Sequence, residues 1–247
     1  WGGRFKTMFD GAEFHRMASV FSMFELAVHA PFYNKINQLL HLDDQSFYLS
    51  YLDSPVLKAR MEFIDAVIND PNPLVSLAGF SMVEGVILYS SFAYLKHYQS
   101  NGKNKLTNIV RGINFSLRDE NLHSVAGAWC FKLLKSKEKM EPFAEFNLKR
   151  TIFDLAEVMY EHECQIVDMT FEKGSVEGIT PDQVKAFVRN RINVCLTQLG
   201  YDPLYPKEED GISSWFYKAI NDYSFNDFFS GMGNQYHRNW DSTRFTW

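Results

Sequence analysis

The sequence predicts an all-α helical bundle. Apolar residues recur at helical spacing over several long segments, whereas no run of alternating β-branched residues joined by an Asn-Gly or Asp-Gly hairpin turn is present. Prolines and glycines separate the helical segments by short links, which is typical of bundles. The chain has 247 residues, 46% of them hydrophobic and 16% aromatic, and can therefore bury a substantial core.

Two helices are predicted in the first part of the chain. The first covers residues 10–40: Asp10 or Gly11 begins it, apolar residues follow at helical spacing, and Pro31 is expected to strain or kink it. The second begins at Ser54-Pro55 and ends near residue 69, because the sequence Asp-Pro-Asn-Pro that follows cannot continue a helix.

A third helix is predicted over residues 74–98, and it is unusually apolar. Its first 22 residues, LVSLAGFSMVEGVILYSSFAYL, are long enough to span a bilayer and carry a single charge, Glu84, in the middle. An ionised carboxylate at the centre of a bilayer is costly, and no second segment of this kind occurs in the sequence. We therefore expect no membrane insertion, but a central helix buried on nearly every side, with Glu84 ligated or paired.

The remaining long helices are predicted over residues 106–134, 142–173 and 181–199. Gly174 ends the second of them, and Thr180 with the following proline caps the third. After Pro203 the composition becomes polar and aromatic, which indicates a short helix followed by an exposed tail. The expected division is a helical domain over residues 1–224 and a C-terminal tail over residues 225–247.

Charge and cysteine content narrow the possible partners and the cell compartment. The net charge is −5 and no long basic stretch is present, so neither a nucleic acid nor a membrane surface is expected as a partner. Cys130, Cys164 and Cys195 lie far apart in the sequence without a CxxC pair. This favours free thiols in a reducing, cytoplasmic environment over a disulfide framework or a zinc site.

Three helical segments carry polar residues where a core helix would normally have apolar ones. Glu120 and His123 are three residues apart, Glu25 and His29 are four apart, and each pair therefore shares one helix face, while Glu84 stands alone. Carboxylate oxygens and imidazole nitrogens suit iron or manganese, and helices with such Glu/His pairs are the pattern of di-iron carboxylate bundles. We therefore predict a ferritin-like helical bundle with a dinuclear metal site in its core.

Each segment also has an interpretation without a metal. A single Glu/His pair on a helix is common, and Glu84 alone would fit a buried carboxylate satisfied by hydrogen bonds. The three segments together, each in apolar surroundings, favour ligation. Glu161-His162-Glu163 is instead expected on a solvated helix face.

Four segments resemble one family, the small (beta, radical-generating) subunit of class I ribonucleotide reductase. The family's RDExxH segment resembles LRDENLHSVAGAW, and its helix with a lone glutamate resembles MVEGVILYSSFAYL. Its Glu/His/Tyr helix is similar to FELAVHAPFY, and its C-terminal stretch is similar to NDFFSGMGNQY. The resemblance runs from about residue 10 to residue 236.

The resemblance implies a role for each matching residue. The metal ligands would be Glu25, His29, Glu84, Glu120 and His123. Tyr33 would be oxidised to a stable radical, Asp119 would hydrogen-bond the ligand His29, and Tyr236 would pass the radical between subunits. Leu88 and Phe92, at i+4 and i+8 from Glu84, would either line a dry pocket for the radical or form ordinary core.

The function that the resemblance implies is that of a radical-generating subunit of ribonucleoside-diphosphate reductase. Its partner would be the large catalytic subunit, and the chain itself would form a homodimer. The metal pair would be Fe/Fe, with Mn/Mn or Mn/Fe as alternatives, because the same ligands serve all of them. The sequence contains neither a GxxxxGK[ST] loop nor a GxGxxG motif, in agreement with a subunit that binds no substrate nucleotide.

Two features depart from the family pattern. The family has ExxH in its first ligand pair, whereas Leu26 occupies that position here and Glu25 lies one residue earlier; a π-bulge between Glu25 and His29 would restore the geometry. The family's first carboxylate ligand, on a preceding helix, has no counterpart. This ligand and the relay tryptophan are expected upstream of Trp1.

Three other classes of protein remain open at this point. A ferritin-like ferroxidase would use similar ligands but would need neither Tyr33 nor the tail around Tyr236. A di-iron oxidase or desaturase would add a substrate channel beside the ligands. A metal-free helical scaffold would have no use for the ligands at all.

Overall fold

The structure is a computed structural model that describes residues 1–221, with side chains as far as residue 217. The described residues form helices and one isolated β-bridge, between Val176 and Ile179, which confirms the all-α prediction. In chain order the helices are α1 (Gly2–Met8), α2 (Ala12–Phe24), the π-helical turn η1 (Glu25–His29), α3 (Ala30–Leu39), α4 (Gln45–Leu49), the 3-10 turn η2 (Ser50–Asp53), α5 (Pro55–Ile68), α6 (Pro73–Val86), α7 (Tyr89–Lys96), the 3-10 turn η3 (His97–Gly102), α8 (Thr107–Lys137), α9 (Pro142–Phe171), α10 (Pro181–Leu199) and α11 (Ser213–Asn221). The expected tail, residues 225–247 with Tyr236, lies outside the described residues.

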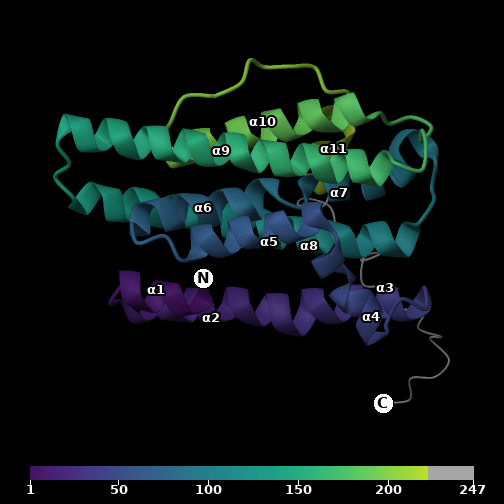
Figure 1. Cartoon of the computed structure of the whole chain (residues 1–247), viewed down its shortest axis with the longest axis horizontal. Coiled ribbons are helices and arrows are strands. Elements are labelled where there is room, and N and C mark those ends of the chain that lie inside the picture. Colours follow the sequence, from purple (N-terminus) through teal and green to yellow (C-terminus); the bar gives the residue numbers. More distant parts are fainter. Residues whose placement is uncertain (222–247) are drawn as a thin grey trace, which may run out of the picture.

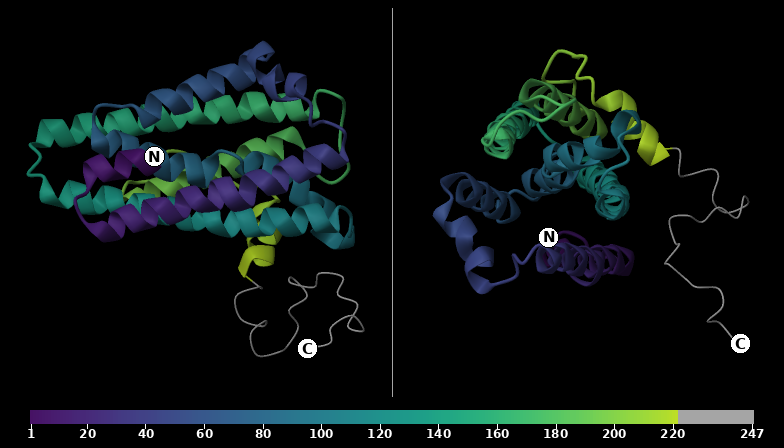
Figure 2. Two further views of the ribbon diagram at one scale, coloured as in Figure 1. Left: turned by 90° about the horizontal axis from the view of Figure 1, so that it is seen from below. Right: turned by 90° about the vertical axis from the view of Figure 1, so that its right-hand side faces the viewer.

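The long helices lie in three layers (Figure 1). In that view α9 and α10 are uppermost, α5, α6 and α8 lie in the middle, and α1 to α3 lie below; the right-hand view of Figure 2 separates the same layers. α6 is central because it packs against α5, α8, α9 and α10. Side chains on α6 and α8 that point toward α2 and α3 therefore meet in the interior of the bundle.

The apolar segment predicted as a central helix is indeed buried. Eleven of the 14 residues of α6 are buried, and Asn72 Oδ1 caps its start by accepting a hydrogen bond from Leu74 N. Among the described residues, one helical stretch, Pro73–Gly102, is long and apolar enough to cross a membrane, but 78% of its most apolar window is buried inside the protein. This burial is that of a core helix.

The prediction of one continuous helix over 74–98 is wrong. α6 ends at Val86, Leu88 takes a left-handed conformation with φ 78°, and α7 begins at Tyr89. As a result Leu88 is exposed, while Phe92 belongs to a separate core cluster with Tyr89 and Phe216. Leu88 and Phe92 therefore do not share a helix face with Glu84, because the break rotates α7 relative to α6.

The first predicted helix is continuous but contains a π-helical turn. α2, η1 and α3 follow one another without a break, and Ala30 N–H donates to Glu25 O, five residues earlier. The turn falls on residues 25–29, where the shifted glutamate suggested a π-bulge. Pro31 follows in the first turn of α3, where its missing N–H is tolerated.

The second half of the chain follows the sequence signals closely. Thr180 and Gln183 form the capping box that begins α10, and Gly200 ends this helix in a left-handed conformation. The short helices α1 and α4 and the turn η2 were not predicted, because segments of four to seven residues are too short to show a helical period.

Candidate metal centre

Three helical elements bring the predicted ligands together. Glu25 comes from η1, Glu84 from the last turn of α6, and Glu120 and His123 from α8. One donor atom from each of these four residues lies within 4.8 Å of the others. Glu120 and His123 are almost fully buried, whereas Glu25 and Glu84 are partly exposed.

His29 extends this group on the η1 side. Its Nδ1 lies 2.9 Å from Oε1 of Glu25 and 3.3 Å from Oε1 of Glu120. Its Nε2 lies 2.9 Å from Oδ2 of Asp119, which is the hydrogen bond predicted for this pair. Asp119 therefore fixes the ring so that Nδ1 faces the carboxylates.

His123 occupies the corresponding position on the other side. Its Nδ1 lies 3.2 Å from Oε2 of Glu84 and 3.3 Å from Oε2 of Glu120. The ring of Phe21, from α2, covers the imidazole at a centroid distance of 4.1 Å. Glu120 thus lies between the two imidazoles, with one carboxylate oxygen toward each.

The ionisation of the group reflects three carboxylates packed around two imidazoles. Burial opposes a charge on His29, but hydrogen bonds to carboxylates outweigh it and raise its pKa to about 11. The same balance raises the pKa of His123 to about 9. Burial and the neighbouring Glu120 raise the pKa of Glu84 to about 7, whereas the two imidazoles lower that of Glu120 to about 2 in spite of its burial.

The donor set fits a pair of hard or borderline divalent cations. Three buried atoms of the group, Glu25 Oε1, His29 Nδ1 and Glu120 Oε2, lie within ion-pair distance of one another or of His123, but none of them makes a hydrogen bond of regular geometry, which is unusual for buried polar atoms. Metal ions would satisfy them and would displace the imidazole protons. Among the described residues the group has three carboxylates, where the di-iron pattern has four.

Two cavities reach the group. One of about 530 Å³ is lined by Glu25, Glu84 and Glu120 together with apolar side chains and Arg60. The other, of about 290 Å³, is lined by Glu25, Glu84 and His123 and by the rings of Trp1, Phe21 and Phe80. The carboxylates are therefore accessible to ions and small molecules.

Tyr33 lies one helical turn after His29. Its hydroxyl donates to Ser116 Oγ, 3.2 Å away on α8, and its ring meets Phe32 edge-on at 5.1 Å. Burial raises the pKa of Tyr33 above its usual value. The phenol is thus neutral and largely enclosed. The sequence contained no signal for Ser116 as its partner, because a serine on a helix is not distinctive.

One predicted surface segment is in fact buried. Glu163 is fully buried, with Oε1 3.1 Å from the guanidinium of Arg60 and Oε2 accepting a hydrogen bond from Ser90. The expectation of a solvated face over Glu161-His162-Glu163 is therefore wrong for Glu163, because α9 turns this residue toward α5 and α7.

The family model for the small chain of ribonucleotide reductase matches residues 1–211. The chain belongs to this family. The ribonucleoside-diphosphate reductase 2 subunit beta of Escherichia coli is 31% identical over 214 residues, which cover 85% of the chain and 65% of that protein. The subunit beta of Bacillus subtilis is 29% identical, covering 92% of the chain and 69% of that protein.

Solved structures of the family have the same fold. The dimanganese(II) NrdF of Streptococcus sanguinis superimposes with a TM-score of 0.72 at 25% identity, covering 85% of the chain and 72% of that structure. The chain spans just under two thirds of the first curated relatives, 65% of the Escherichia coli protein and 64% of a Mycobacterium tuberculosis one.

Proposed function

We propose that the chain acts as the radical-generating small subunit of a ribonucleoside-diphosphate reductase. The observation that carries this proposal is the convergence of η1, α6 and α8 on one buried group of carboxylates and imidazoles, in a chain of the small-chain family. The wide π-turn matters most, because it directs both Glu25 and His29 toward Glu120 although Glu25 is one residue out of the family's register.

We propose Glu25, His29, Glu84, Glu120 and His123 as the metal ligands. When bound, the metal pair would supply the oxidising power for one-electron chemistry. Glu120 would contribute to binding the pair at the centre of the group, because its two oxygens face different imidazoles. Asp119 holds the ring of His29 with Nδ1 toward the site.

Tyr33 is the residue we propose as the radical site. The hydrogen bond from its hydroxyl to Ser116 Oγ fixes where the phenolic proton points, and Phe32 and core side chains pack against the partly buried ring. An enclosed phenol close to the ligands suits a radical that must persist.

The metal pair is proposed to be iron or manganese. The Streptococcus sanguinis relative is a dimanganese(II) protein, while the sequence favours Fe/Fe with Mn/Mn or Mn/Fe as alternatives. Oxygen and nitrogen donors accept each of these ions. Metal analysis of protein loaded with each ion separately, and with both, decides between them.

The proposed partners are the large catalytic subunit and a second copy of the chain. Residues 225–247, with Tyr236, would contact the large subunit. Two apolar stripes are exposed at helical spacing: Met23 and Leu26 on α2 and η1, and Leu122, Val125 and Trp129 on α8. Such stripes are typical of an interface, and support the homodimer.

Three free thiols support a cytoplasmic location.

The central experiment is metal analysis combined with EPR spectroscopy of the oxidised protein. We expect two metal ions per chain and a tyrosyl radical that is lost in Tyr33→Phe, while the metal content of that variant stays the same. No bound transition metal would contradict the proposed function. A radical signal that survives in Tyr33→Phe would contradict only the role of Tyr33.

Partner binding separates the reductase from other di-iron proteins. A chain lacking residues 225–247 should lose binding to the large subunit but keep its metals. Tyr236→Phe should bind the large subunit normally and fail to support turnover. Equal binding by the full-length and shortened chains would contradict the role of the tail.

A further inference from the structure

α6 ends two residues after Glu84, and a backbone carbonyl in its last turn has an unusual hydrogen-bond donor. The left-handed Leu88 breaks the helix, so the carbonyls of its last turn lack the usual donors four residues ahead. Arg191, from α10, donates from Nε to the oxygen of Gly85 at 2.9 Å. The side chain of Arg191 thus holds the residue next to the ligand Glu84.

Gly85 allows this close approach. A Cβ atom at this position would lie 2.4 Å from Sγ of Cys195 and 2.5 Å from Oγ of Ser124, so any larger residue would push α6 away from α8 and α10. The turn that carries Glu84 is therefore fitted closely against the helix that carries Arg191.

Arg191 is a buried cation without an anion. It is 2% exposed, no carboxylate of the described residues lies within ion-pair distance, and its Nη2 has no hydrogen-bond partner. Its guanidinium lies 4.1 Å from the ring centre of Tyr89, and Nη1 donates to the hydroxyl of Tyr217 at 2.9 Å. A buried charge of this kind is costly, and an apolar side chain of similar size would often serve stability equally well.

The three contacts of Arg191 join three elements: the end of α6 at Gly85, the start of α7 at Tyr89 and α11 at Tyr217. We infer that Arg191 is a positioning residue that holds the Glu84 turn in the metal site and couples it to α11. This inference rests on the proposed function, in which Glu84 is a ligand and the residues after α11 engage the large subunit.

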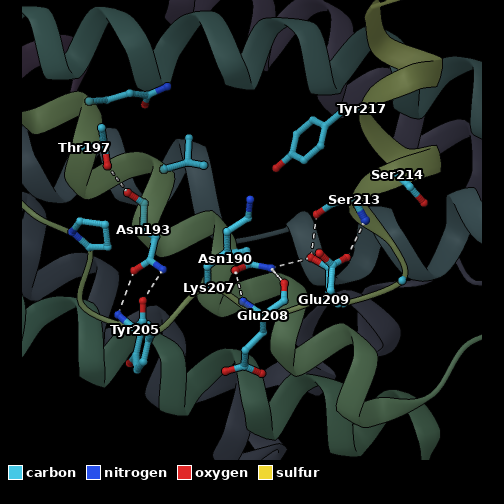
Figure 3. A pocket seen from close by; sticks show the side chains of 15 residues that line it. Asn190, Asn193, Thr197, Tyr205, Lys207, Glu208, Glu209, Ser213, Ser214 and Tyr217 are labelled. Atoms are coloured by element: carbon cyan, nitrogen blue, oxygen red, sulfur yellow. Dashed lines mark hydrogen bonds between the residues drawn. The ribbon is translucent and has the colours of Figure 1, made fainter.

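The contact between Arg191 and α11, at Tyr217, lies beside a cavity. Tyr217 lines a cavity of about 770 Å³ between α10, the segment 203–211 and α11, and Figure 3 shows its ring beside the space enclosed by the other lining residues. A contact that moves Tyr217 would therefore act on Arg191, and through Gly85 on Glu84. Because coupling is reciprocal, metal binding should in turn restrain α11.

Arg189 provides a matched control. It lies on the same helix two residues earlier, pairs with Glu208 through Nε at 2.8 Å and stacks on Tyr160, and it makes no contact with α6. Replacing either arginine by methionine removes a charge from α10, but only Arg191→Met removes the donor to Gly85.

The experiment measures Mn²⁺ affinity by calorimetry, with thermal unfolding of each metal-free variant as a check on folding. Removing outer partners of ligands typically weakens metal binding about 10–100-fold. We expect a loss in this range for Arg191→Met, a smaller loss of about fivefold for Tyr217→Phe and no change for Arg189→Met. Arg191→Lys, which can still reach Gly85 O, should recover part of the affinity.

Hydrogen exchange tests the coupling directly. Mn²⁺ should slow amide exchange in α11 of the native protein and should not do so in Tyr217→Phe. Affinities for Arg191→Met and Tyr217→Phe equal to the native value, or an equal loss in Arg189→Met, would overturn the inference. If the native chain itself binds no metal, the proposed function fails instead, and the two failures are thus distinguishable.

Discussion

The metal centre and the cavity beside α11 are both lined by polar side chains, but these side chains have different partners in the two regions. The α11 cavity, at about 770 Å³, is larger than either cavity beside the carboxylates, at about 530 and 290 Å³. Its polar groups, however, bind the segment that encloses it: Asn193 bonds the backbone of Leu204 and Tyr205, and Asn190 bonds Glu208 O and Asp210 (Figure 3). In the metal centre, by contrast, the carboxylates and imidazoles face one another, where they could bind metal ions.

Two carboxylates show the difference most clearly. Burial disfavours the charged form of Asp210, but hydrogen bonds from Ser213, Asn190 and the backbone outweigh it and lower its pKa. Glu84 is partly exposed and lies 3.2 Å from His123, yet burial and the neighbouring carboxylate of Glu120 outweigh that contact and raise its pKa to about 7. In this chain the candidate site is therefore marked by closely packed ionisable side chains and not by the size of a cavity.

The largest expected effect of a single substitution is the loss of metal binding in Glu120→Ala. This change removes the carboxylate between the two imidazoles, and should weaken Mn²⁺ binding by more than the roughly 10–100-fold typical of outer partners. Calorimetry with Mn²⁺ measures it. Asn193→Ala, in the other region, removes bonds to the backbone of Leu204 and Tyr205 and none to α11, and should bind Mn²⁺ as the native chain does. A comparable loss there would refute the contrast between the regions.

Metal should also stabilise the native chain. Free metal at 100 times its dissociation constant should add about 2.7 kcal/mol to the free energy of unfolding, because the unfolded chain lacks the assembled site. Urea unfolding with and without EDTA measures this difference. Glu120→Ala should unfold at the same urea concentration in both conditions, and a metal response in that variant would speak against ligation by Glu120.

The side chains that hold the segment 203–211, unlike Tyr217, should respond to substitution in stability alone. Asn193→Ala leaves the backbone groups of Leu204 and Tyr205 without their partners, and should lower the free energy of unfolding by about 1–3 kcal/mol. Thr197→Ala, whose hydroxyl bonds only Asn193 O within its own helix, is the control and should change it by less than about 0.5 kcal/mol. A change in Mn²⁺ affinity in Asn193→Ala would break the separation of the two regions.

The smallest expected effect concerns Tyr33. Burial raises the pKa of this phenol, and the hydrogen bond to Ser116 lowers it, so Ser116→Ala should raise the pKa further. NMR of protein labelled with ¹³C in tyrosine follows the titration, and Tyr33→Phe identifies the signal. An unchanged or lower pKa in Ser116→Ala would show that Ser116 is not the partner of the phenol.

The sequence predicted the long helices and the gathering of the ligands, because both follow from local periodicity and residue spacing. The π-turn could also be inferred, since Glu25 lies one residue earlier than the ExxH spacing of the family. The break after α6 could not, because Ile87-Leu88 contains neither proline nor glycine. The contact that satisfies the carbonyl of Gly85 at this break is tertiary, because its donor, Arg191, lies more than 100 positions away in the sequence.

The π-helical turn at Glu25–His29 also keeps the apolar faces of α2 and α3 on the same side of one long helix. In a regular helix an inserted residue rotates everything beyond it by about 100°, which would carry one half of its apolar face into solvent. Here Phe21, before the turn, covers His123, and Phe32, after it, packs on Gly112, so both halves face α8. The five-residue turn thus accommodates the additional residue without rotating α3 relative to α2. A comparison of sequences aligned without a gap would assign the ligand role to Leu26 instead of Glu25.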